Sequence, residues 1–134
     1  MYLALLSKEQ KEIFLDLAYV ISSADGNFGE EEKNAIAAYC QEMQIEFQQE
    51  KDVRSMADII EGLSDFGDLI SRKIIIFEAI GLAMVDGNYD KKEREIIEHL
   101  MAAFHLEMDY ARRCEAIISK YIEISDKIKK LVIG

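Results

Sequence analysis

The sequence predicts an all-α protein: a compact bundle of six to seven helices that forms one domain over residues 1–134. Composition is the first reason, since half of the residues are hydrophobic and proline is absent. Spacing is the second, because apolar residues recur every three or four positions between short stretches that hold most of the seven glycines, as in amphipathic helices joined by turns. An internal repeat is the third, and it predicts two helix hairpins with a pseudo-twofold relation. A chain of this length buries about two-thirds of its unfolded surface without a disulfide or cofactor.

The first repeat, over about residues 10–45, follows a helix start signal. Ser7 and Gln10 have the spacing of a capping box, in which each side chain bonds the backbone N–H of the other. One apolar stripe follows and ends where Gly26 can take the left-handed conformation of a helix C-terminus. The next helix opens at Gly29, and the three glutamates after it suit the positive end of the helix dipole. The buried face of that helix holds Ile36, Tyr39, Cys40 and Met43.

Two helices of different character are predicted for the middle of the chain. A weaker amphipathic segment runs over about residues 50–61. From about Asp68 to Val85 the chain is apolar on almost every side, which indicates a helix that others enclose. We expect this segment to be the central helix of the bundle.

The second repeat, over about residues 70–106, pairs the central helix with the helix that follows it. Asp90 and Glu93 form the D-x-x-E variant of the capping box. The packed face of that helix holds Ile96, Ile97, Leu100, Met101 and Phe104. The final run, from about Met108 to Val132, is either one helix or two helices broken near Ser125.

The two repeats share a motif at an offset of 61 residues. Residues 24–36 read ADGNFGEEEKNAI, and residues 85–97 read VDGNYDKKEREII. Both copies hold an Asp-Gly-Asn turn, then an aromatic residue, and a glutamate seven positions after the aspartate. The match indicates an internal duplication, in which Phe28 and Tyr89 anchor the two turns to the core.

The sequence leaves two interpretations of these turns open. In the first, the turns are architectural: glycine supplies positive φ, Asp and Asn bond nearby backbone groups, and Glu32 and Glu93 stabilise helix N-termini. In the second, Asp25, Glu32, Asp86 and Glu93 converge and bind Ca²⁺, Mg²⁺ or Mn²⁺, because hard cations take several carboxylate oxygens. An EF-hand is excluded by spacing, since a glutamate and an isoleucine stand where that loop needs its glycine and its bidentate glutamate.

The doubled pattern, a helix ending in Ala-Asp-Gly or Val-Asp-Gly with a glutamate seven residues after the aspartate, resembles the TerB or TerB-like family associated with tellurite resistance. The resemblance covers roughly residues 10–118. It implies an all-helical bundle with pseudo-twofold halves, an acidic metal-binding surface that includes the same four acids, and a role in stress response or sensing. Similar domains also occur in membrane-associated DnaJ-like co-chaperones. Direct detoxification of tellurite is not expected, because the sequence offers no reducing thiol site or redox cofactor for it.

The net charge of −10 is placed unevenly, since residues 1–70 hold 15 acids and 5 bases while residues 71–134 hold 11 of each. Such a chain repels phosphate backbones, so we expect a basic protein surface as partner and no nucleic acid. Cys40 and Cys114 lack any metal-ligand or redox spacing, which is typical of reduced cysteines in a cytoplasmic protein. No apolar stretch has the length of a membrane span, and we expect no membrane insertion.

We expect no enzymatic activity. His99 and His105 are six positions apart and so lie on different faces of a continuing helix, and no phosphate-binding glycine loop or nucleophile motif is present. The alternative to a cation-binding module is a protein-interaction scaffold whose Asp-Gly turns are purely structural. In that case the apolar ends, residues 3–6 and 131–133, either pack together or mediate dimerisation, and the protein is a monomer or a weak homodimer.

Overall fold

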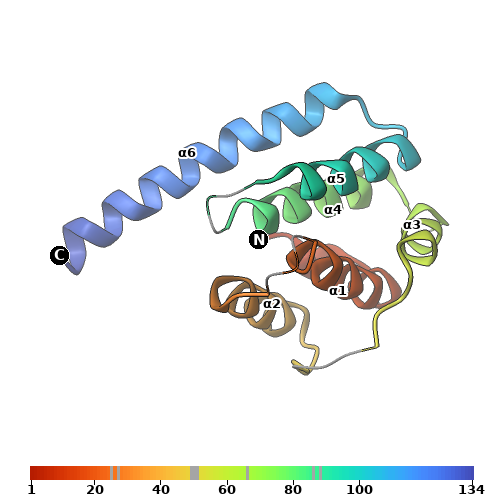
Figure 1. Cartoon of the computed structure of the whole chain (residues 1–134), viewed down its shortest axis with the longest axis horizontal. Coiled ribbons are helices and arrows are strands. Elements are labelled where there is room, and N and C mark those ends of the chain that lie inside the picture. The colour runs from red at the N-terminus through yellow and green to blue at the C-terminus, as the bar shows by residue number, and fades with distance from the viewer. Residues whose placement is uncertain (25, 27, 49–51, 66, 86, 88) are drawn as a thin grey trace.

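Helices and their connections make up the whole described part of the chain (Figure 1). The computed structural model describes residues 1–134 except 25, 27, 49–51, 66, 86 and 88. Within these residues it holds no strand, one 3₁₀ turn and six α-helices. Their bounds are η1 Leu3–Leu5, α1 Lys8–Ser22, α2 Glu30–Met43, α3 Met56–Asp65, α4 Leu69–Ala83, α5 Lys91–Ala103 and α6 Met108–Val132. The prediction of an all-α bundle is confirmed.

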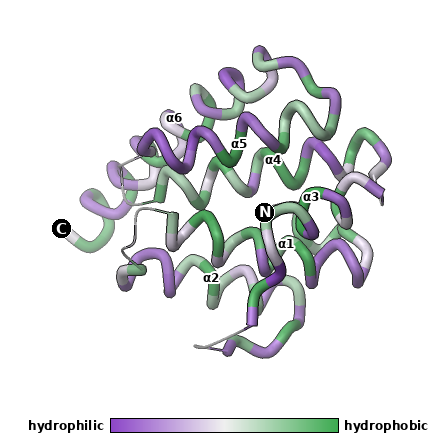
Figure 2. The backbone as a smooth tube through the Cα atoms, turned by 45° about the vertical axis from the view of Figure 1, so that its right-hand side comes forward, coloured by the Kyte–Doolittle hydropathy of each residue, from purple (hydrophilic) through white to green (hydrophobic). Residues whose placement is uncertain are grey.

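Helices α1 and α4 pack against each other at the centre of the bundle. The helices α2 and α3 pack on α1, and α5 and α6 pack on α4. Apolar and hydrophilic residues alternate along the outer helices (Figure 2), whereas α1 and α4 bury side chains on most of their circumference. The prediction that residues 68–85 form an enclosed central helix therefore holds, and α1 is its partner in the core.

The helix ends follow the predicted signals. Ser7 and Gln10 form the capping box of α1, and Asp90 and Glu93 form that of α5. Gly26 lies beyond the end of α1 with a φ of +79°, a conformation that residues with a Cβ rarely adopt. These ends were readable from the sequence because each depends on residues close together in the chain.

The backbone of the first hairpin recurs in the second hairpin at the offset of 61. The bounds of α1 recur in α4, and α5 begins 61 residues after α2. Gly87 repeats the φ of +79° found at Gly26, and His105 (φ 56°) repeats the left-handed conformation of Gln44 (φ 59°). The motif copies therefore have the same local conformation at these positions, while the pseudo-twofold relation between the hairpins stays a prediction.

The two helices that follow the hairpins differ from each other. Helix α3 begins at Met56, later than the pattern over residues 50–61 indicated, and α6 continues without a break through Ser125. The C-terminal half of α6 extends past the rest of the bundle, and the C-terminus lies far from the N-terminus (Figure 1). Leu3 and Leu6 are buried, whereas Leu131 is 85% exposed. Of the two alternatives for the apolar ends, packing against each other is therefore not what the structure has, because α6 carries its end away from the core, and dimerisation stays a prediction.

Candidate functional site: Asp-Gly turns and an apolar groove

The two Asp-Gly turns are closed by equivalent backbone hydrogen bonds. The N–H of Gly26 donates to the carbonyl of Ser23 at 2.9 Å, and the N–H of Gly87 donates to the carbonyl of Met84 at 3.0 Å. Asp25 and Asp86, two of the four predicted cation ligands, lie outside the described residues. The geometry of the predicted site can thus be followed only at its glutamates.

Glu93 and Glu32 both lie at the first turn of a helix. The carboxylate of Glu93 accepts the N–H of Asp90 at 3.1 Å, and Asp90 accepts the N–H of Glu93 at 2.9 Å. Glu93 is buried in this arrangement. The carboxylate of Glu32 lies against its own N-cap residue, since Oε2 would be 3.0 Å from a Cβ built on Gly29. Both glutamates have the architectural position that the first interpretation predicts.

The described residues do not form a divalent-cation centre by themselves. Among them, no three His, Cys, Asp or Glu side chains come close enough together to hold a metal ion. Glu32 and Glu93 each lie against the N-terminus of their own helix. Hard cations need several oxygen ligands, so a site built on these glutamates would depend on Asp25 and Asp86.

Aromatic residues attach both turns to the bundle, as predicted. The ring centroid of Phe28 lies 5.9 Å from that of Tyr19 on α1. The guanidinium of Arg94 lies 4.0 Å from the ring centroid of Tyr89, and its Nη1 donates to Glu115 of α6 at 3.1 Å. Burial, followed by the nearby Glu115 carboxylate, raises the pKa of Tyr89. The second turn is therefore tied to α6 as well as to α4.

A pocket of about 430 Å³ lies where the start of α2 approaches the second turn. Its lining includes Glu31 of α2, Gly87 of the second turn, and Ser119 and Asp126 of α6. Acidic side chains from both halves of the chain thus share one hollow. An approach of the two motif regions belonged to one of the two interpretations that the sequence left open, and neither interpretation included α6.

Sequence reasoning missed a groove of about 510 Å³ beside α6. We call it the apolar groove. Its lining residues are Met1, Tyr2, Tyr39, Phe77, Glu78, Gly81, Val85, Ile117, Ile118, Tyr121 and Ile122. Val85 and Ile122 also line the pocket that holds Glu31 and Asp126, so the two hollows adjoin. Most of these side chains are aliphatic or aromatic, which suits an apolar occupant.

Two carboxylates lie at the N-terminal end of the apolar groove. Glu78 is buried. Its carboxylate accepts hydrogen bonds from the terminal ammonium at 2.8 Å and from the N–H of Tyr2 at 3.1 Å. Glu42 accepts the same ammonium at 3.2 Å and the N–H of Leu3 at 2.8 Å. Burial lowers the pKa of the ammonium, but Glu78 and Glu42 outweigh it and raise that pKa above its usual value. These contacts hold the N-terminal residues in place as one wall of the groove.

Helix α4 has one glycine in its interior, Gly81. No close contact in the described part of the chain requires the absence of a side chain there. A Cβ built on Gly81 meets nothing within 4 Å, whereas one built on Gly62 of α3 would lie 2.7 Å from Cδ1 of Ile13. Glycine inside a helix costs about 1 kcal/mol relative to alanine. Packing of α3 on α1 accounts for Gly62. Gly81 instead leaves open space beside the apolar groove.

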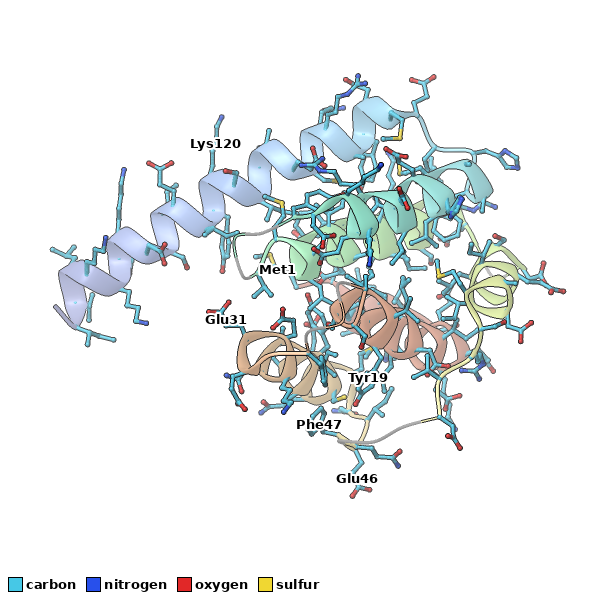
Figure 3. All side chains as sticks on the ribbon, in the orientation of Figure 1. Met1, Tyr19, Glu31, Glu46, Phe47 and Lys120 are labelled. Atoms are coloured by element: carbon cyan, nitrogen blue, oxygen red, sulfur yellow. The ribbon has the colours of Figure 1, made fainter. Side chains whose placement is uncertain are left out.

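The outer face of α6 carries an apolar stripe that the rest of the described chain leaves exposed. The α6 stripe consists of Ile117, Tyr121, Ile124, Ile128 and Leu131. Each of them is more than half exposed, from 54% at Tyr121 to 85% at Leu131. Their steps of four and three residues are those of a coiled-coil seam. Lys120 points away from the bundle (Figure 3). The sequence showed this pattern but not that the bundle leaves it uncovered.

The cysteines and histidines differ in exposure. Cys40 and Cys114 are both buried, and burial raises the pKa of Cys114, which disfavours its thiolate. His99 is exposed on α5, and His105 lies just beyond the end of that helix. No helix among the described residues is long and apolar enough to cross a membrane.

No protein-family model, curated protein or solved structure matches this chain significantly. The resemblance to TerB domains stays a prediction.

Proposed function

We propose that this chain is a non-catalytic interaction module that binds an amphipathic helix with basic flanks in the apolar groove. The observation that carries the proposal is the open floor of the groove at Gly81. Helices pack with their axes about 8–10 Å apart, depending on the side chains at the contact. A glycine at this position lets a second helix approach α4 closely, at the expense of the intrinsic stability of α4.

The walls of the groove favour a helix that presents aliphatic side chains. Tyr2 and Phe77 meet edge to face, with ring centroids 6.2 Å apart, and Tyr2 remains 52% exposed. Tyr2, Phe77 and Ile117 also line shallower hollows that continue the surface towards Ile70, which is 67% exposed. Burial of apolar surface is the main favourable term in helix docking. The length of this surface suits a helix better than a compact small molecule.

Charge around the groove favours a basic partner. The groove adjoins the pocket that is lined by Glu31 and Asp126, so its acidic surroundings lie on that side. Lys73 and Arg113 line the hollow on the side of Ile117. Complementary charges raise association rates and select partners. A helix with lysines beside its apolar stripe therefore fits better than one with acids.

The test is a titration with synthetic helices. The first carries leucines at steps of three and four residues with lysine flanks; the second has glutamate flanks, and the third has the first composition in scrambled order. The titrated chain carries Ile128→Asp and Leu131→Asp, which leave the groove-lining residues in place. We expect binding of the lysine-flanked helix alone, measured by fluorescence anisotropy, and its loss when Gly81→Leu fills the groove. Equal binding of all three peptides, or none, would overturn the proposal.

Divalent-cation binding is the second candidate function. It is favoured by the pocket in which Glu31 and Asp126 lie beside the second Asp-Gly turn. The test is the melting temperature in millimolar Ca²⁺, Mg²⁺ or Mn²⁺ against metal-free buffer. We expect an increase that disappears in Asp25→Asn with Asp86→Asn. An unchanged melting temperature, or a double variant that already melts far lower without metal, would instead favour a purely architectural role for the turns.

A further inference from the structure

We propose that the helix in the apolar groove is the C-terminal half of α6 from a second copy, so that two copies exchange their α6 ends in an antiparallel dimer. This inference rests on the proposed function and names its partner. The chain itself carries both complementary parts: an apolar groove and an apolar helix end that its own bundle leaves exposed.

The donor is the end of α6. Ile128 is 56% exposed, Leu131 is 85% exposed, and all the residues from 123 to 132 are exposed. This part of α6 extends away from the bundle (Figure 1). An isolated amphipathic helix gains most of its stability from packing of its apolar face. A second copy supplies the surface that this end lacks.

The positions of the α6 stripe allow one twofold axis to place the α6 end of each copy at the groove of the other. Ile117 and Tyr121 form the α6 wall of the groove, while Ile128 and Leu131 lie on the other side of Ile124. In an antiparallel pair centred on Ile124, the donor end of each copy lies opposite the groove of the other. Leu131 is seven residues from Ile124, so at 1.5 Å per residue it lies about 11 Å along the helix from the symmetry axis. Such a twofold contact is isologous and closes after two copies.

Charge supports the same arrangement. The segment from residue 120 to 134 holds four lysines and two acids, so the donor end is basic in an otherwise acidic protein. The pocket beside the groove is lined by Glu31. Lysines beside the α6 stripe are thus the basic flanks that the groove favours.

The first measurement is the dissociation constant of the dimer by analytical ultracentrifugation. We expect Ile128→Asp with Leu131→Asp, and separately Gly81→Leu, to weaken the dimer on the order of a hundredfold, because the first removes apolar burial and the second fills the groove. Ala116→Asp is the matched control, since Ala116 is exposed on another face of α6. A dimer that all of these variants leave unchanged would overturn the inference.

Complementation distinguishes exchange from other dimers. The variant with Ile128→Asp and Leu131→Asp keeps an intact groove, and the Gly81→Leu variant keeps an intact α6 end. Mixing the two should restore a heterodimer with one occupied groove, weaker than the wild-type dimer and detected with one partner fluorescently labelled. Failure to complement would overturn the exchange. A monomeric wild type that still binds the lysine-flanked peptide would overturn the dimer alone, and a monomer that binds no peptide would overturn the proposed function as well.

Discussion

The bounds of α1 and α4 are 61 residues apart, but the face of α1 that holds Asp16 is closed by a connection, whereas the face of α4 that holds Phe77 lies beside the apolar groove. Asp16 of α1 is fully buried and binds both the backbone N–H and the guanidinium of Arg54, from the connection between α2 and α3. The hydroxyl of Tyr19 donates to the carbonyl of Gln48 in the same connection, which passes beside α1 at Phe47 (Figure 3). This part of the chain therefore closes the outer face of α1.

Within the described part of the chain the matching face of α4 is covered in part, by Tyr2 on Phe77, and the apolar groove lies beside these two rings. At the offset of 61, Phe77 stands where α1 has Asp16, and Gly81 stands where α1 has Val20. Only residues 104–107 connect α5 to α6, against residues 44–55 between α2 and α3, so the second connection is too short to wrap α4 in the same way. In the described part of the chain, the connection that closes α1 thus has no counterpart of similar length beside the apolar groove.

The largest expected effect tests the cover of α1. Arg54→Ala leaves the buried carboxylate of Asp16 without its guanidinium, and breaking a buried ion pair costs about 3 kcal/mol. We expect the free energy of unfolding, measured by urea denaturation, to fall by about that amount. Arg112→Ala, at an exposed position of α6, is the control and should change stability by less than about 0.5 kcal/mol. Equal effects of the two variants would show that the connection does not secure α1.

An intermediate effect separates the two helix-interior glycines. Gly62→Leu places a side chain against Ile13, and overpacking costs about 1–3 kcal/mol. Gly81→Leu meets open space and gains helix propensity, so it should stabilise the folded monomer by up to about 1 kcal/mol. Both changes are made in the chain with Ile128→Asp and Leu131→Asp, which removes dimerisation from the comparison. Destabilisation by Gly81→Leu would mean that α4 itself requires the glycine.

The smallest expected effect compares the two helix caps. Asp90→Ala removes the side chain that accepts the N–H of Glu93, and should destabilise the chain by about 1 kcal/mol. Gly29→Ser introduces a side-chain cap at the equivalent position of α2 and should add a few tenths of a kcal/mol. Thermal denaturation at constant pH measures both. A less stable Gly29→Ser variant would show that the added Cβ displaces Glu32 from its place beside the N-cap of α2.

Local signals predicted the helix ends well. Ser7, Gln10, Asp90 and Glu93 act within one turn of the chain, where spacing alone brings the partners together. Whether Asp25 and Asp86 approach a common point was not predictable, because that distance depends on how the two hairpins pack. Arg54 and Asp16 were missed for a related reason: they are 38 residues apart, and neither carries a local motif.

The sequence by itself determined the all-α fold, the helix caps, the doubled turns and the apolar stripe of α6, because each depends on periodicity or on neighbours a few residues away. Only the tertiary structure decided which apolar faces are covered. Phe77, Gly81 and Ile117 meet in one groove through the packing of α4 and α6, and the end of α6 is left exposed because the bundle finishes before the helix does. Burial of an apolar face depends on what lies opposite it in space, which helical periodicity does not specify.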